Sequence, residues 1–231
     1  MTTSRVREEW SARIVAEYMS AAITQHLVLW LMQAVAPREL VEAGLAIVTD
    51  ELAHSRSSEE VYRAAGGTTL PVLEREALGL TRVSRRLEDD ILLVGVRVFC
   101  VGETVAVPLF RQLRESCTQP IARQALDRIL RDEVRHREFG WDLLDWMISL
   151  DRAAAVERVT EALPAMFREL EHSYGRGNAA VASDDGAISD VERSWGLAPP
   201  REYADVLART IERDYRPRFN ARGIDLPAGV T

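Results

Sequence analysis

The sequence has little of what marks secreted, disulfide-rich or membrane-spanning proteins. It holds only two cysteines, Cys100 and Cys117, which do not form a CxxC pair, so reduced thiols are expected rather than a disulfide framework. The N-terminal stretch MTTSRVREEW is charged where the apolar core of a secretion signal would begin. The longest apolar run, LVLWLM at residues 27–32, is too short to span a bilayer. These absences predict a cytoplasmic protein that does not enter a membrane.

Charge and composition also limit which kind of protein and which partners are expected. The chain has 29 basic and 36 acidic residues, a net charge of −7, and no evident basic face, so nucleic acid is not an expected partner. Glycine (13) and proline (9) are sparse, whereas 47% of the residues are hydrophobic, enough for a sizeable core. At 231 residues, we expect one domain covering 1–231.

Helical periodicity dominates the chain, and strand-like alternation is nearly absent. Six helices are expected, at about 4–34, 37–66, 86–116, 120–150, 151–173 and 200–218. The irregular segment between the second and third helices is long enough to run the length of a bundle. We therefore predict an all-α fold: a ferritin-like four-helix bundle with one long crossover at 1–150, covered by two additional C-terminal helices at 151–231.

Local irregularities are also expected. Pro108 lies inside the third helix and predicts a kink or bulge near Glu103. The stretch GRGNAAVASDDGAISD at 175–190 is of low complexity and is expected to be a loop, either a lid or a simple connection. The first helix is apolar nearly all round at 27–32, so the C-terminal helices or a second copy in a homodimer would have to cover it.

One motif, D-E-x-x-H, occurs in two of the expected helices, at residues 50–54 and 132–136. Residues three apart differ by about 60° around a helix axis, so the Glu and the His of each motif share a face. That is a spacing of metal ligands. The two pairs are Glu51 with His54 and Glu133 with His136.

Each pair has a carboxylate upstream at the distance of a helical hairpin. Glu103 lies 30 residues before Glu133, which places both about 15 residues from a turn near Thr118. Glu17 lies 34 residues before Glu51, on the apolar stripe of the first helix. A third Glu-x-x-His pair, at residues 169–172, has no such partner and is given no metal role.

The ligand on the first helix has alternatives. Gln25 and His26 lie at plausible depth, but His26 is nine residues after Glu17, about 180° around the helix. Ala21 cannot ligate a metal. Glu17 is therefore the chosen ligand.

Buried glutamates also occur in proteins without metal, where arginine or lysine pairs with them. The inner stripes of the four helices hold no evident basic residue near the glutamates. Four buried carboxylates without compensation would cost on the order of several kcal/mol each, even after relaxation. Two cations remove that cost, so the pattern predicts a dinuclear metal site.

Together these residues resemble the ferritin-like di-iron carboxylate superfamily, in which each half of the bundle supplies one carboxylate and one Glu-x-x-His. The resemblance covers about 150 residues. The D-E-x-x-H form is similar to that of oxygen-activating members, where the Asp accepts a hydrogen bond from a ligand histidine. It implies metal ligands and histidine partners as follows: ligands Glu17, Glu51, His54, Glu103, Glu133 and His136, with Asp50 and Asp132 as the partners.

The resemblance implies an O2-dependent oxidase or oxygenase with two iron ions, or manganese in their place, acting on a small organic molecule. An apolar wall would protect the reaction from water, and Phe99, Ala106, Val107 and Phe110 are predicted to form it. No flavin, NAD or iron–sulfur motif is present, so electrons would come from an external donor or the substrate. Three alternatives stay open: iron oxidation and storage, peroxide scavenging, and an interaction module with a structural metal.

Overall fold

The computed structural model describes residues 2–174 and 187–230; 78% of these residues are helical and none of them forms a strand. This confirms the all-α class. In chain order the elements are α1 (Ser4–Gln33), α2 (Arg38–Ala64), η1 (Arg75–Leu78), α3 (Leu87–Gly95), η2 (Val96–Glu103), α4 (Thr104–Ser116), α5 (Pro120–Leu150), α6 (Arg152–Ser173), α8 (Asp190–Ser194), α9 (Pro200–Thr210), η4 (Ile211–Tyr215) and α10 (Arg216–Asn220).

The helix boundaries follow local signals that the sequence carries. Thr3 caps α1 by accepting a hydrogen bond from the backbone N–H of Val6 at 3.4 Å. Asp151 caps α6 in the same way through the N–H of Ala154, at 3.1 Å. Pro120 is the first residue of α5, where its missing N–H costs nothing. The expected helix limits therefore agree with the structure to within a few residues.

By its internal contacts the chain divides into two compact units. The first unit comprises Met1–Arg82, Phe110–Asp132 and Ile188–Ala198, and the second comprises Val83–Leu109, Glu133–Ala187 and Pro199–Thr231. Helix α5 belongs to the first unit up to Asp132 and to the second from Glu133 onward. The four-helix bundle, the single domain and its division at residue 150 stay predictions.

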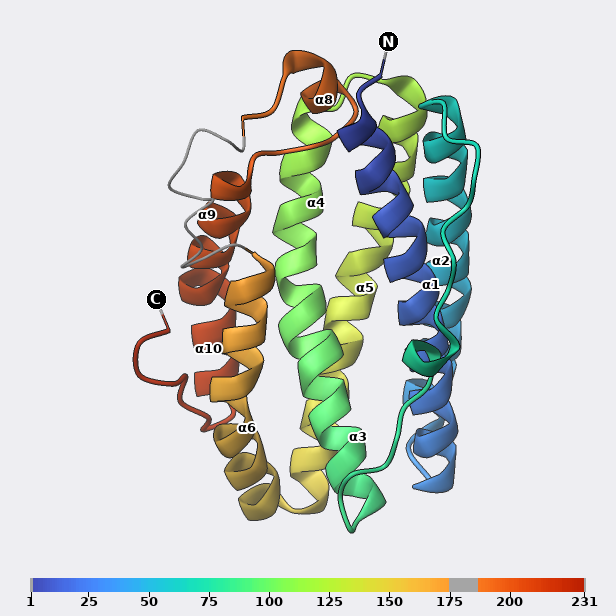
Figure 1. The fold of residues 1–231 in the computed structure, drawn as a ribbon. Coiled ribbons are helices and arrows are strands. Elements are labelled where there is room, and N and C mark those ends of the chain that lie inside the picture. The colour runs from blue at the N-terminus through green and yellow to red at the C-terminus, as the bar shows by residue number, and fades with distance from the viewer. Residues whose placement is uncertain (1, 175–186, 231) are drawn as a thin grey trace. The chain divides into compact units, whose positions relative to one another are not determined.

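The first unit is built on the hairpin of α1 and α2, which run side by side along most of their length (Figure 1). The turn between them includes Val35, which takes a positive φ of 53°. The shared face of the hairpin is apolar except at a few positions. Its buried apolar side chains on α1 are Val6, Trp10, Ile14, Ala21, Leu27, Val28, Trp30 and Leu31, and those on α2 include Leu40, Ile47, Ala53 and Val61.

In the second unit, the helix expected at 86–116 is interrupted by the π-helix η2, which ends at Glu103. The predicted bulge near Glu103 is thus confirmed. Pro108 lacks an N–H, and its ring crowds the carbonyl of Thr104, the residue directly after the π-helix. π-helical turns are rare and occur frequently at functional sites.

Helix α5 approaches η2 very closely at Gly140. A Cβ built on Gly140 would lie 2.5 Å from the Cβ of Phe99 and 2.8 Å from the backbone nitrogen of Cys100. The Cys100 thiol donates a hydrogen bond to the Gly140 carbonyl at 3.1 Å. Glycine is required here because the contact is with backbone, which cannot rotate away.

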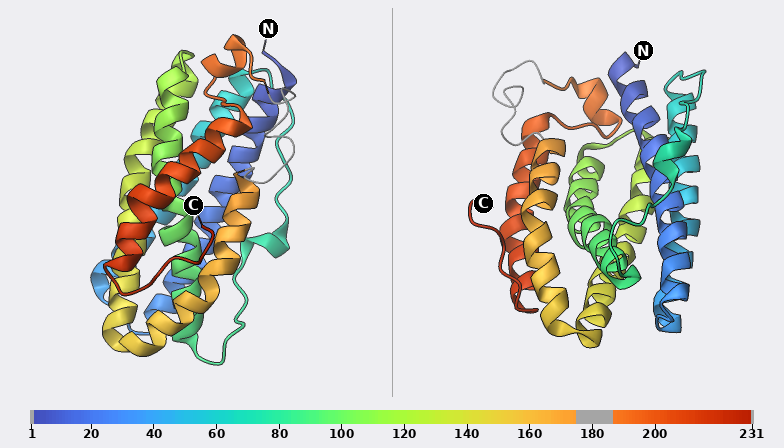
Figure 2. Two further views of the ribbon diagram at one scale, coloured as in Figure 1. Left: turned by 90° about the vertical axis from the view of Figure 1, so that its left-hand side faces the viewer. Right: turned by 60° about the horizontal axis from the view of Figure 1, so that its bottom comes forward.

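The C-terminal segments complete the second unit. Figure 2 shows α6 beside α9 and α10, and the ring of Phe167 on α6 packs edge-on against Tyr215 on η4. The Tyr215 hydroxyl donates to the backbone carbonyl of Val101 within η2. Within the loop expected at 175–190, residues 175–186 lie outside the described residues, and α8 begins at Asp190.

Two helical stretches, Ser4–Gln33 and Leu87–Ser116, are long and apolar enough to cross a membrane by length and composition. Core helices of soluble proteins share these features, and 44% and 56% of the residues in an apolar 18-residue segment of each stretch are buried within the protein. Location therefore stays a prediction. On α1, Leu29 and Met32 are exposed, and their coverage by a second copy is untested.

Replacing Gly140 with alanine is expected to destabilise the protein by about 1–3 kcal/mol, because the new methyl group overlaps the backbone of η2. Gly102 on η2 is the matched control: a Cβ there meets only the carbonyl oxygen of Arg97, at 3.7 Å. Gly102→Ala should be neutral or mildly stabilising. Urea unfolding of both variants measures the difference, and equal stabilities would refute the close approach.

Candidate metal centre

Three acid and imidazole side chains gather inside the first unit. Glu17 comes from α1, and Glu51 and His54 come from one turn of α2. Their exposed fractions are 7%, 1% and 0%, so all three are removed from water. They are inside because each occupies a position on the apolar stripe of its helix, where the neighbouring turns carry core residues. We call these three residues the His54 cluster.

The distances within the His54 cluster suit ligands of one ion. The Nδ1 atom of His54 lies 3.6 Å from Glu51 Oε2 and 3.7 Å from Glu17 Oε2. These separations are too long for good hydrogen bonds. Two ligands that each lie about 2.0–2.2 Å from one ion are roughly 3.0–3.5 Å apart, so small side-chain rotations would bring all three into coordination.

Electrostatics without a metal are unfavourable in the His54 cluster. The pKa of Glu17 is raised from 4.5 to about 8, chiefly by burial. The nearby His54 ring lowers this pKa, and the Glu51 carboxylate raises it. Burial lowers the pKa of His54, but Glu17 and Glu51 outweigh it and raise that pKa to about 11. The metal-free cluster therefore retains protons that a cation would displace.

Asp132 on α5 holds the other nitrogen of the His54 ring. His54 Nε2 lies 3.1 Å from Asp132 Oδ2, and Asp132 is 2% exposed. The Arg131 guanidinium donates to Asp132 Oδ1 at 3.2 Å. Burial alone would raise the pKa of Asp132, but the hydrogen bonds from His54 and Arg131 hold it below its usual value. Asp132 stays ionised, fixes the ring and leaves Nδ1 facing the two glutamates.

A second group of the same chemistry lies in the second unit. Glu103 is the last residue of η2, and Glu133 and His136 share one face of α5. His136 Nδ1 lies 3.4 Å from Glu133 Oε2, and ligand atoms of Glu103 and His136 come within 4.8 Å of each other. Glu133 and His136 are buried, while Glu103 is half-buried. We call these residues the His136 cluster.

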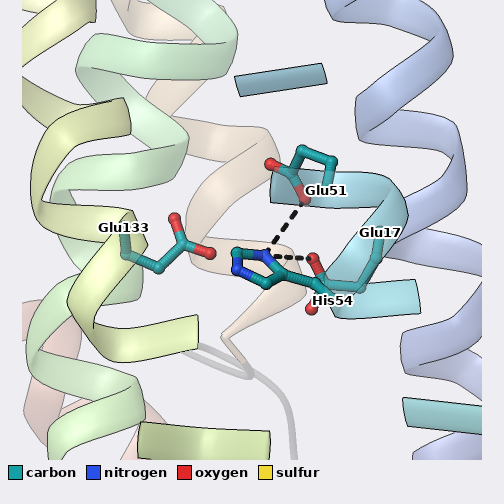
Figure 3. Close-up of side chains that lie close together, drawn as sticks. All are labelled: Glu17, Glu51, His54 and Glu133. Carbon is teal, nitrogen blue, oxygen red and sulfur yellow. Dashed lines mark ion pairs between the residues drawn. The ribbon is translucent and has the colours of Figure 1, made fainter. Parts of the chain in front are cut away.

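Glu133 follows Asp132 directly on α5. Its Oε2 atom is buried and makes no hydrogen bond with any described residue, which is the condition of an acceptor available to a cation. The buried side chains of Glu17, Glu51 and His54 can hold a metal ion, and Figure 3 shows both glutamates close to the His54 ring. The structure does not identify the metal.

The remaining predicted residues stand as follows. Asp50 is half-buried on α2, and its role toward a histidine stays a prediction. Phe99 packs edge-on against Phe139, and the Phe110 ring lies 5.4 Å from the Arg13 guanidinium. Val107 is buried and Ala106 half-buried. Their role as a pocket wall is untested.

Two rejected positions lie elsewhere, as expected. His26 accepts a hydrogen bond at Nδ1 from the backbone N–H of Leu80, at 2.9 Å, on the crossover segment. Glu169 of the third Glu-x-x-His pair is 58% exposed and forms an ion pair with Arg97 at 2.9 Å. Helical phase therefore separated His26 from the two clusters, and the lack of a hairpin partner separated the third Glu-x-x-His pair.

Sequence analysis missed two residues near Glu17. The Ser20 hydroxyl donates to Glu51 Oε1 at 2.8 Å and fixes one oxygen of that carboxylate. Ser20 is three residues after Glu17, on the same helix face, so its spacing could have indicated it. The second is Arg13, a basic residue that is 7% exposed, one turn before Glu17. Its guanidinium hydrogen-bonds Glu9 and stacks on Trp10.

Comparison with known proteins identifies no relative: no protein-family model matches the chain, and no curated protein matches it. The argument for function therefore depends on the geometry of the two clusters.

The pH dependence of stability should invert when metal is added. With a chelator present, unfolding free energy should fall as pH rises from about 4.5 to about 8, because the unfolded chain releases the Glu17 proton first and the folded protein retains it. The slope from one proton is about 1.4 kcal/mol per pH unit. With a divalent metal, stabilisation should grow with pH, since binding releases protons. Thermal unfolding with and without chelator measures both, and parallel profiles would contradict the assignment.

Asp132→Asn is expected to weaken metal binding by about 10- to 100-fold, because an amide no longer holds the His54 ring as a carboxylate does. Asp127 is the matched control, an exposed α5 carboxylate that pairs with Arg114. Titration with cobalt(II), followed by its absorption, measures the affinity of both variants. Equal weakening by Asp127→Asn would show that the effect is only loss of surface charge.

Proposed function

We propose that this protein is an O2-dependent di-iron oxidoreductase that oxidises a small organic substrate. The His54 cluster and the His136 cluster would bind one iron ion each or share two between them. Manganese is the alternative metal, since mixed carboxylate and imidazole ligands suit either ion. Reducing equivalents would come from an external donor or from the substrate.

The observation that carries the proposal is the His54 cluster with its partner Asp132. Two glutamates and a histidine, each less than a tenth exposed, surround one point inside the protein. Burial of such groups is costly unless charge is compensated. The six proposed ligands include four carboxylates with a charge of −4, and two divalent cations would supply +4.

The covalent continuity of α5 supports combining the two clusters in one centre. Asp132 contacts His54, and Glu133 is the next residue on the helix. The Glu-x-x-His pair of α5 begins at that residue, so Asp132, the partner of His54, and the start of the His136 cluster are one peptide bond apart. We propose that the glutamates and histidines of the two clusters would supply the ligands of the two ions.

When bound, two ferrous ions supply the two electrons that begin the reduction of O2. The residues of this chain have other tasks. Asp132 and Ser20 hold His54 and Glu51 in orientation. Glu17 gives up its proton on metal binding. The buried side chains around the clusters exclude water, which protects a reactive centre from side reactions.

The test is metal analysis of protein purified without oxygen, followed by addition of O2. We expect about two irons per chain and O2 consumption that a substrate accelerates. Glu51→Gln should lose at least half of the metal, because Glu51 is central to the His54 cluster. Glu42→Gln, an exposed position on the same helix, should retain it.

Other outcomes would point elsewhere. Mineral formation within a large assembly would replace the proposal with iron storage, and rapid loss of added peroxide would replace it with peroxide scavenging. Full metal content in Glu51→Gln would remove the ligand assignment itself.

A further inference from the structure

A groove lies between α2 and the first part of α5, entirely within the first unit. It has a volume of about 500 Å³. That is within the range of small-molecule sites in proteins. It is lined by Ala53, Arg56, Ser57, Glu60, Ile121, Gln124, Ala125, Asp127, Arg128 and Arg131. We call it the arginine groove.

Small side chains create the depression, and long basic side chains surround it. Ala53 on α2 and Ala125 on α5 are both buried and leave space between the helices. Arg56 from α2 and Arg128 and Arg131 from α5 line the same groove, although the helices meet there from different parts of the chain. Three guanidinium groups thus converge on one cavity in a protein with a net charge of −7.

The acidic residues of the groove do not cancel this charge. Asp127 forms an ion pair with Arg114, which lies outside the lining, and Glu60 is the one other carboxylate among the lining residues. Arg56 forms no ion pair with any described residue. An exposed guanidinium can bind an anionic ligand through terminal nitrogens that no carboxylate occupies.

Two of the arginines lie close to the Asp132 carboxylate, and Arg131 is hydrogen-bonded to it. The Arg131 Nε atom lies 3.2 Å from Asp132 Oδ1, and the Arg128 Nε atom lies 4.0 Å from Asp132 Oδ2. Such contacts restrict the long side chains before any ligand arrives, which lowers the entropy lost on binding. Their terminal nitrogens remain available for a ligand.

The type of cation favours a particular ligand chemistry. All 29 basic residues of the chain are arginine, and none is lysine. The planar guanidinium binds carboxylate and phosphate groups in a bidentate manner, which an ammonium group cannot do. Ser57 and Gln124 add neutral hydrogen-bonding groups within the same cavity.

We propose that the arginine groove is a binding site for a small dianionic molecule that carries carboxylate or phosphate groups. Arg56 binds one end of the molecule, and Arg128 with Arg131 binds the other. The site is separate from the proposed metal ligands and does not depend on the proposed function, because none of its lining residues belongs to either cluster.

Calorimetric titration of metal-free protein with inorganic phosphate and with succinate, at constant ionic strength in chloride, tests the site. We expect one saturable site per chain for at least one of the two anions, and the tighter anion identifies the preferred group. Arg56→Gln should weaken binding about tenfold or more, as expected for a lost hydrogen bond to a charged group. Arg128→Gln should also weaken it.

Arg63 supplies the matched control. It lies on α2 two turns after Arg56, forms an ion pair with Glu59 at 2.8 Å and does not line the groove. Arg63→Gln removes the same charge and should bind as the wild type does. Circular dichroism checks that each variant is folded. The proposal is overturned if neither anion saturates, or if Arg56→Gln and Arg63→Gln bind equally well.

Discussion

The constraint on which the structure depends is the removal of water from ionisable groups around His54. A carboxylate loses several kcal/mol of effective hydration when it is buried, and the His54 cluster contains two of them within reach of one imidazole. Without a cation the Glu17 carboxyl group keeps its proton to a higher pH, as its raised pKa indicates. With a cation the same groups become ligands. The cluster is thus costly as part of a core and favourable as a metal site.

Orientation is the second element of the account. A histidine selects which nitrogen binds a metal through the hydrogen bond that the other nitrogen makes. In this protein Asp132 holds Nε2 of His54, and Arg131 holds Asp132. Through these two contacts the exposed Arg131 is connected to the buried imidazole of His54. The same contacts adjoin the arginine groove, because Arg131 is one of its lining residues.

Much of this could be read from the sequence, because helical phase is a strong signal. The 3.6-residue spacing of apolar side chains predicted every long helix. It also predicted that Glu17, Glu51 and His54 face inward, and in the structure all three are buried. Helical phase also excluded His26 from the ligands, and in the structure His26 accepts a hydrogen bond from the crossover segment. The π-helix before Glu103 was foreseen only as an irregularity, since Pro108 marks a disturbance without specifying its form.

Other features depend on contacts that the sequence does not display. Arg13 is buried because its guanidinium lies over the rings of Trp10 and Phe110. No local sequence pattern predicts this contact. The requirement for glycine at position 140 comes from the backbone of η2, forty residues earlier. The arginine groove brings residues of α2 and α5 together, more than sixty positions apart.

The most direct measurement of the central claim is a crystal structure of protein loaded with iron without oxygen, with anomalous scattering recorded at the iron edge. The account predicts two anomalous peaks, one coordinated by His54 Nδ1 and the other by His136, with glutamate oxygens on both. Density without an anomalous peak at His54, with Glu17 and Glu51 bound to arginine or to water alone, would contradict it.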